Sequence, residues 1–213
     1  MTYERGLLRG EAEFYRIARE YHAAPVPEVV FFDEADPSGM LMTERPGRPW
    51  NEAATDLDAP ATARLRHQLG SCVARLHQIT GTRFGYPGGA IPMADSWREA
   101  FTAMLAALLH DAERYRAPLP LPLDRVHALT EAAAPALEMV TTPALVHFDL
   151  WQGNVLLHNG EISALIDGDG GTSRKESGGG RSGATRWPSW SPSTCWPTPS
   201  ATPTSSPAIR PQA

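Results

Sequence analysis

The sequence predicts an α+β fold, in which helices and antiparallel strands occupy separate stretches of the chain. Three observations support this prediction. A helical hydrophobic pattern near the N-terminus is followed by two short strand patterns. Three longer helical patterns occupy the middle of the chain. A second strand–turn–strand pattern then follows, around Asn159 and Gly160.

The first helix is expected in "GLLRGEAEFYRIAREYH", where apolar residues recur every three or four positions until "PVP" ends the pattern. Two strands are expected next, in "EVVFFDE" and "GMLMTE". The residues between them, "ADPSG", are typical of a turn, because Asp, Pro, Ser and Gly each favour turn conformations. The N-terminal part is therefore predicted to be a helix followed by a hairpin.

The middle of the chain is predicted to be mainly helical. After "PGRPW" breaks the strand pattern, helical periodicity returns at about 59–79, at about 94–116 and near 123–139. The segment between the first two helices contains "GTRFGYPGG", which its glycines and proline mark as a loop. Cys72 lies on the first of these helices and is expected to pack in the core.

A second hairpin is predicted in the last third of the chain. The short apolar run "ALVH" is expected to be a strand, and "NVLLH" and "ISALID" are expected to be two more. Asn159 and Gly160 separate the last two strands. This dipeptide is a strong hairpin signal, because a type I′ turn requires positive φ at both central residues.

Length and composition indicate a globular protein. The chain has 213 residues, of which 42% are hydrophobic, enough to form a core. Its two cysteines, Cys72 and Cys195, are too few for a disulfide framework or a Cys-rich zinc site. The sequence has no stretch like a signal peptide and no apolar run of about 18 residues. A cytoplasmic protein without a membrane segment is therefore expected.

Charge is unevenly distributed along the chain. Residues 1–170 contain 14 basic and 23 acidic side chains, whereas residues 171–213 contain five basic and one acidic. The second region is rich in Ser, Thr, Pro and Gly and has no helical or strand period, so a disordered tail is expected. Its few dispersed positive charges are a weak footprint for nucleic-acid binding despite three tryptophans. No nucleic-acid partner is expected.

Three polar side chains mark strand ends in the last third of the chain. Asp149 follows one predicted strand, Asn154 opens the next and Asp167 closes the last. Because a hairpin returns beside its own start, Asn154 and Asp167 should be neighbours, with Asp149 close by. Two hard oxygen ligands suit Mg²⁺, and a free carboxylate beside them can orient or deprotonate a hydroxyl that attacks a phosphate. The pattern therefore predicts a phosphoryl-transfer site.

These residues resemble the catalytic segment of a known family. "HFDLWQGN" is similar to the catalytic loop of the aminoglycoside phosphotransferase and choline kinase group, and "LID" is similar to its metal-binding segment. The resemblance implies a protein-kinase-like two-lobe fold with Mg²⁺ and ATP, or alternatively GTP, as cofactors. It implies that Asp149 is the catalytic base, that Asn154 and Asp167 bind Mg²⁺, and that His147 supports the loop. Phe148 departs from the family, in which many members have glycine.

The resemblance extends to the N-terminal part. "RGEAEFYRIA" resembles the small-lobe helix of the family, with Glu11 in place of the glutamate that pairs with the ATP-binding lysine. "MLMTERPG" resembles the hinge between the lobes. The resemblance implies that the backbone of Met42, Thr43 and Glu44 meets the adenine of the nucleotide.

Three regions follow from the resemblance. Residues 1–47 are expected to form a partial small, nucleotide-binding lobe with the hinge. Residues 48–169 are expected to form the large catalytic lobe, mainly helical, with the catalytic hairpin. Residues 170–213 are expected to be a disordered or frameshifted tail. The implied function is ATP- and Mg²⁺-dependent phosphorylation of a hydroxyl on a small molecule, such as an aminoglycoside, a sugar or an amino alcohol. The sequence leaves the oligomeric state undefined.

Two features depart from the family pattern. The only lysine is Lys175, whereas the family has a lysine on the strand before the small-lobe helix and a Gly-rich turn over the phosphates. Only ten residues precede Glu11, so the chain is expected to begin late in the small lobe and to be an impaired catalyst. The tail resembles GC-rich codons read in a displaced frame, because a shifted reading can encode the "GDP" segment that the family has after "ID".

Two other functions remain open. The missing lysine favours a non-catalytic remnant or binding protein. A metal-dependent hydrolase would use His147, Asp149, His158 and Asp167 as ligands. Against it, His158 lies at the far end of its strand, roughly 13 Å from Asn154 at about 3.3 Å per residue. Zinc content would identify the hydrolase, and Mg²⁺-dependent nucleotide binding would separate a kinase from a remnant.

Overall fold

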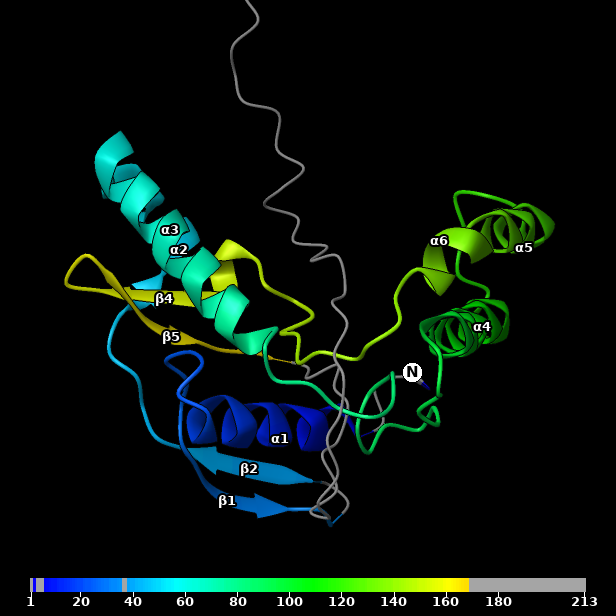
Figure 1. Ribbon diagram of the computed structural model, residues 1–213, viewed down its shortest axis with the longest axis horizontal. Helices are drawn as coiled ribbons and strands as arrows, with labels where there is room; N and C mark the ends of the chain where they lie inside the picture. The colour runs from blue at the N-terminus through cyan, green and yellow to red at the C-terminus, as the bar shows by residue number, and fades with distance from the viewer. Residues whose placement is uncertain (1, 3–5, 36–37, 169–213) are drawn as a thin grey trace, which may run out of the picture.

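The computed structural model describes Thr2 and residues 6–35 and 38–168, which form two groups of elements (Figure 1). In the first group, α1 lies between the β1–β2 sheet and the β4–β5 hairpin, and α3 packs on that hairpin. The second group contains the helices α4, α5 and α6. In chain order the elements are α1 (Leu7–Glu20), β1 (Val29–Asp33), β2 (Gly39–Met42), β3 (Arg48–Pro49), α2 (Trp50–Ala53), the 3₁₀ turn η1 (Ala54–Asp56), α3 (Ala59–Leu76), α4 (Trp97–Tyr115), α5 (Leu123–Ala132), α6 (Ala134–Glu138), the 3₁₀ turn η2 (Gln152–Asn154), β4 (Val155–His158) and β5 (Glu161–Leu165).

The N-terminal helix and hairpin are confirmed. Strands β1 and β2 pair antiparallel, with a bulge near Val29. The buried face of α1 includes Phe14, Tyr15 and Ala18, which belong to the main hydrophobic core. On the other face of the small sheet, the cross-strand partners Phe31 and Leu41 stay exposed. The helical spacing of these apolar residues therefore places them on the one face of α1 that packs into the main core.

Helix α3 begins at a capped end and contributes one face to the main core. The carboxylate of Asp58 accepts a hydrogen bond from the Ala61 amide at 2.7 Å, which satisfies one of the unpaired donors at a helix N-terminus. Leu65, Cys72 and Leu76 are buried on this helix, so the predicted burial of Cys72 is confirmed.

The stretch near 123–139 is helical as predicted, but it is divided into two helices, α5 and α6. Pro135 explains the interruption, since proline has no N–H to donate to the carbonyl four residues earlier and its ring clashes with that turn. Trp97 and Ala100 of α4 form a small second core with Phe84, and Leu137 of α6 packs against it.

Two local predictions also need correction. "ALVH" is not a regular strand: Ala144 makes only an isolated bridge to Thr80. Conversely, part of the segment "PGRPW" forms β3, which pairs with β4. Gly47 makes this approach possible, because its φ is +127° and an added Cβ would lie 2.5 Å from the Leu157 carbonyl oxygen.

The hairpin at the end of the described chain is confirmed. Asn159 and Gly160 have φ values of 51° and 80°, as a type I′ turn requires. Val155 pairs with Leu165, so the start of β4 lies beside the end of β5. In this way the hairpin brings the residues just before β4 close to those just after β5.

Within the described part of the chain, no helix is long and apolar enough to span a membrane. The division into lobes at residues 47 and 48 stays a prediction. The predicted tail, residues 170–213, lies outside the described residues, and so does Lys175.

Candidate active site

A tight loop connects the end of "ALVH" to β4. The Asp149 amide donates to the His147 carbonyl at 2.9 Å, and the Trp151 amide donates to the Asp149 carbonyl at 3.2 Å. Phe148, between the first two, has a φ of 70°, which is rare for a side chain without special support. The Asn154 amide donates to the Trp151 carbonyl at 3.0 Å and closes the loop. These backbone bonds fix the direction in which the Asp149 side chain leaves the loop.

The side chains of Asp149, Asn154 and Asp167 converge at the open end of the hairpin, as the sequence predicts. The Nδ2 atom of Asn154 lies 2.9 Å from the Asp149 carbonyl oxygen and 3.2 Å from its carboxylate Oδ2. The same nitrogen lies 3.4 Å from the Oδ2 of Asp167. Asn154 is buried, Asp149 is partly buried and Asp167 is exposed. The amide therefore joins two carboxylates, one of which faces solvent.

The hairpin register explains this convergence. After the last ladder pair, Val155 with Leu165, the Ile166 amide still donates to the Asn154 carbonyl at 2.9 Å. Asp167 follows directly and has a φ of 58°, in the left-handed region. This turn of the backbone ends the strand where its carboxylate meets Asn154.

The chemistry of Asn154 and Asp167 fits a magnesium ion. Asp167 supplies carboxylate oxygens, and the amide of Asn154 has one carbonyl oxygen to offer, while Asp149 is the predicted base beside them. Because Nδ2 is anchored on the Asp149 backbone, Oδ1 is the atom of that amide left for a cation. Hard oxygen ligands in small number are what Mg²⁺ takes when phosphate oxygens and water complete its octahedron.

The family model of the phosphotransferase enzyme family (APH) matches residues 2–169. The chain belongs to this family. No curated protein matches the sequence. The mixed α+β fold is the protein-kinase-like fold of solved APH structures.

Three solved structures illustrate the likeness. A thermostable mutant of the aminoglycoside phosphotransferase APH(4)-Ia, in complex with ADP and hygromycin B, is 22% identical, with a TM-score of 0.53 over 75% of this chain and 55% of that chain. A Thermobifida fusca protein described as a fructosamine-3-kinase is 28% identical, with a TM-score of 0.53 over 79% and 56%. APH(2″)-IIa, in complex with streptomycin and ATP, is 19% identical, with a TM-score of 0.55 over 79% and 57%. The chain spans just over half the length of these structures.

Tyr15 is a residue near the APH site that the sequence did not reveal. Its hydroxyl donates to Glu11 Oε1 at 2.6 Å, and the hydroxyl oxygen accepts a hydrogen bond from the Asp167 amide at 2.8 Å. The spacing of four residues between Glu11 and Tyr15 on one helix is visible in the sequence. Their link to Asp167 depends on a contact across 152 residues, which no local pattern encodes. The predicted pairing of Glu11 with a phosphate-binding lysine stays a prediction.

His147 is buried directly before the loop that carries Asp149, with 4% of its surface exposed. Its ring packs edge-on against Phe14, with the ring centroids 5.2 Å apart. Neither ring nitrogen of His147 has a hydrogen-bond partner within the described residues. The nearby Ile166 backbone acts to raise the pKa of the ring, but burial has the larger, opposite effect. Burial lowers the pKa of His147 to about 4. The predicted supporting role of His147 remains a prediction that this placement fits.

We expect the low pKa of His147 to make the fold sensitive to acid. Below about pH 6.5 the unfolded chain binds a proton at this residue, while the folded protein does not until about pH 4. The free energy of unfolding should therefore fall by up to about 3 kcal/mol across this window. Urea unfolding of the wild type and of His147→Leu at several pH values measures this.

The His147→Leu variant should lose most of this fall, and His158→Leu serves as the control for removing an exposed histidine. An equal slope in the wild type and in His147→Leu would contradict the assignment.

The predicted hinge begins at Met42, the last residue of β2, and its residues are exposed. Met42 pairs with Val29 in the sheet. The Thr43 amide donates to the Glu28 carbonyl at 2.9 Å, and its hydroxyl accepts from the Glu28 amide at the same distance. The Thr43 amide is thus engaged. Contact of Met42, Thr43 and Glu44 with adenine stays a prediction, and the Thr43 amide is already used within the sheet.

The hydrolase alternative has no geometric support. His158 pairs with Glu161 beside the turn, at the opposite end of β4 from Asn154. In the described ranges, no group of three or more His, Cys, Asp and Glu side chains is arranged to hold a metal ion. The two carboxylates and one amide at the APH site are a smaller donor set, which suits a cation that also binds phosphate and water.

Proposed function

We propose that this chain carries the site of an ATP- and Mg²⁺-dependent phosphotransferase that acts on a hydroxyl of a small molecule. The observation that carries the proposal is that the carboxylates of Asp149 and Asp167 both lie within hydrogen-bonding distance of the side-chain amide of Asn154. Membership of the APH family supports it. Two of the three solved relatives support the cofactor, because they were captured with ADP or ATP.

Each of the three residues has a distinct role in this proposal. Asn154 and Asp167 would hold Mg²⁺, which would neutralise charge on the nucleotide phosphates. Asp149 accepts the proton of the acceptor hydroxyl. The acceptor oxygen forms a bond to the γ-phosphorus while the bond from that phosphorus to the bridging oxygen of ADP breaks. The tight backbone of the loop keeps the Asp149 carboxylate beside Asn154, so the base is held in place before the acceptor arrives.

Cationic or sugar-like acceptors are the class that fits best. The region of residues 1–170 is strongly acidic, and a negative surface attracts cationic amino sugars and amino alcohols. Two of the solved relatives were captured with the aminoglycosides hygromycin B and streptomycin. The Thermobifida fusca relative is described as acting on fructosamine. An amine-bearing molecule with a free hydroxyl is therefore the first acceptor to test.

Turnover is expected to be slow. The only lysine in the sequence is Lys175, so the described residues have no lysine to hold the α- and β-phosphates. Positioning and charge neutralisation supply most of the rate in this chemistry. A test therefore has to detect a single round of transfer.

Single-turnover transfer from labelled ATP tests the proposed function. The purified chain, in excess over [γ-³²P]ATP and Mg²⁺, is mixed with an aminoglycoside, a ketosamine or an amino alcohol. We expect one class to become labelled, and we expect Asp149→Asn to slow the transfer by about 10³-fold, within the range for loss of a general base. Asp124→Asn, an exposed carboxylate on α5, is the matched control. Absence of label in every acceptor, or equal rates in Asp149→Asn and the wild type, would refute the proposal.

A further inference from the structure

We propose that Tyr15 is a positioning residue, which holds the Asp167 backbone so that its carboxylate faces Asn154. The inference rests on the proposed function, because it assigns Tyr15 to the same metal site. The hydroxyl oxygen of Tyr15 accepts from the Asp167 amide at 2.8 Å, and Asp167 Oδ2 lies 3.4 Å from Asn154 Nδ2. One residue of α1 thereby contacts the residue that the metal requires.

The backbone of Asp167 needs such support. Its φ of 58° lies in the left-handed region, where the Cβ of an ordinary side chain crowds the following carbonyl oxygen. Asp tolerates this conformation better than most residues but adopts it mainly where neighbouring groups hold it. The group that bonds to Tyr15 is the backbone amide of Asp167 itself. Loss of the bond should let Asp167 relax toward ordinary backbone angles and move its carboxylate.

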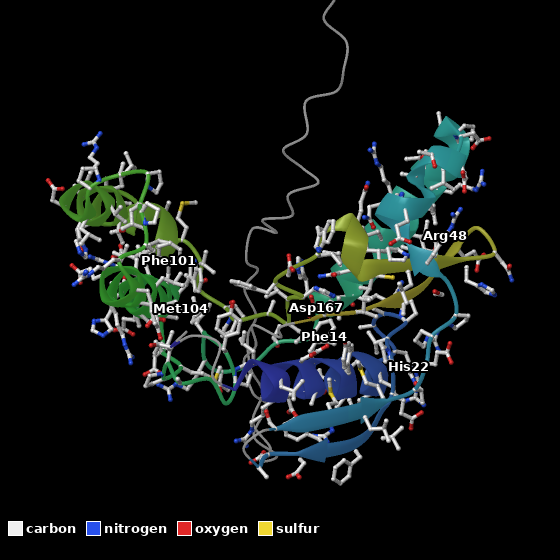
Figure 2. All side chains as sticks on the ribbon, turned by 180° about the vertical axis from the view of Figure 1, so that it is seen from behind. Phe14, His22, Arg48, Phe101, Met104 and Asp167 are labelled. Atoms are coloured by element: carbon white, nitrogen blue, oxygen red, sulfur yellow. The ribbon has the colours of Figure 1, made fainter. Side chains whose placement is uncertain are left out.

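The next residue is held by the same helix. Gly168 is buried against Phe14, and a Cβ added at Gly168 would lie 2.5 Å from the Phe14 ring. Figure 2 shows Phe14 and Asp167 close together between α1 and the end of β5. Phe14 fixes the position of the segment by packing, whereas Tyr15 fixes the direction of one amide by a hydrogen bond.

The two hydrogen bonds of Tyr15 have defined directions. Tyr15 is fully buried. Its hydroxyl donates a hydrogen bond to Glu11 and accepts one from the Asp167 amide. Glu11 orients the hydroxyl from the other side. A Glu11→Gln change keeps an acceptor there and should disturb Asp167 less than a Tyr15→Phe change.

Two readouts on the full chain test the inference. The first is hydrogen exchange of the Asp167 amide by NMR, and the second is binding of Mn²⁺ by electron paramagnetic resonance. Tyr15→Phe should speed exchange at Asp167 while the Ile166 amide, bound to the Asn154 carbonyl, stays protected. Affinity for Mn²⁺ should fall about five-fold, as expected for one lost hydrogen bond. Glu11→Gln should change both readouts less.

A matched variant separates positioning from general destabilisation. Leu65→Val removes one methylene from the core on α3, and it should leave Asp167 exchange and Mn²⁺ affinity unchanged. Unchanged exchange at Asp167 in Tyr15→Phe, or faster exchange with unchanged Mn²⁺ affinity, would overturn the inference. An unprotected Asp167 amide in the wild type would overturn it without any variant. A wild type that binds no Mn²⁺ would instead refute the metal site of the proposed function, and exchange alone would then decide whether Tyr15 holds Asp167.

Discussion

Replacement of Asp167 with alanine is expected to lower Mg²⁺ affinity by at least about 100-fold, since loss of even an outer partner of a metal ligand typically costs 10–100-fold. Mg²⁺-dependent binding of AMP-PNP should disappear with it. Asp167 is the exposed carboxylate of the three-residue site, and its Oδ2 lies 3.4 Å from the Asn154 amide. No other carboxylate in the described residues hydrogen-bonds to the Asn154 amide except that of Asp149, which is proposed to remain free as the base. Isothermal titration with AMP-PNP, with and without Mg²⁺, measures the effect.

The matched control is Glu161→Ala, which removes an exposed carboxylate from the same hairpin at its opposite end. This variant should bind the nucleotide as the wild type does. Equal Mg²⁺-dependent binding by Asp167→Ala and Glu161→Ala would show that Asp167 is not the principal ligand. Asp167→Ala should lower the free energy of unfolding by only about 1 kcal/mol, the cost of a left-handed φ at alanine, because the Asp167 side chain itself is exposed.

Replacement of Phe14 with alanine should be the most destabilising single change near the site. The side chain is fully buried, with its ring against His147 and against Gly168. Removing a buried phenylalanine leaves a cavity and typically costs about 3–5 kcal/mol of unfolding free energy. Phe31→Ala provides a control of the same chemistry, because Phe31 is 60% exposed on β1 and should cost no more than about 0.5 kcal/mol.

Urea unfolding of the two variants and the wild type, at one pH near 7.5, gives both values. A cost for Phe14→Ala that is as small as the cost for Phe31→Ala would contradict the packing of α1 against the catalytic segment. The result bears on function as well. Phe14 holds Gly168 in place, so its loss should also weaken Mn²⁺ binding in whatever fraction of the protein remains folded.

The catalytic hairpin could be predicted because its determinants are local. Asn159 and Gly160 define a two-residue turn, and a turn of known length fixes which residues face each other across the strands. The nearness of Asn154 and Asp167 then follows from the sequence alone. The same reasoning gave the first helix and hairpin, whose periodicity and turn residues lie within the first 45 positions.

The features that sequence analysis missed depend on distant contacts or on one overlooked residue. Strand β3 exists because Gly47 lets the chain approach the carbonyl of Leu157, more than a hundred residues away. The isolated bridge at Ala144 likewise reflects how the chain meets Thr80 rather than the strand propensity of "ALVH". Pro135 was visible in the sequence and was sufficient to predict the break between α5 and α6.

Tyr15 shows the same limit at the site itself. Its spacing from Glu11 is a local feature, but a tyrosine on the apolar face of a helix is ordinarily a core residue. Only the fold shows that its hydroxyl meets the Asp167 amide. Glu11 was predicted from the family resemblance, whereas Tyr15, which links it to Asp167, was not.

A crystal structure of the 213-residue chain with Mn²⁺ and AMP-PNP would test most directly whether Asp149, Asn154 and Asp167 form one phosphotransfer site. Mn²⁺ takes the same hard oxygen ligands as Mg²⁺ and gives an anomalous signal that locates it. We expect an anomalous peak about 2.1 Å from one oxygen of Asn154 and one of Asp167, with the Asp149 carboxylate facing the γ-phosphate. A peak bound to other residues, with Asn154 and Asp167 making no contact with metal or nucleotide, would contradict the assignment.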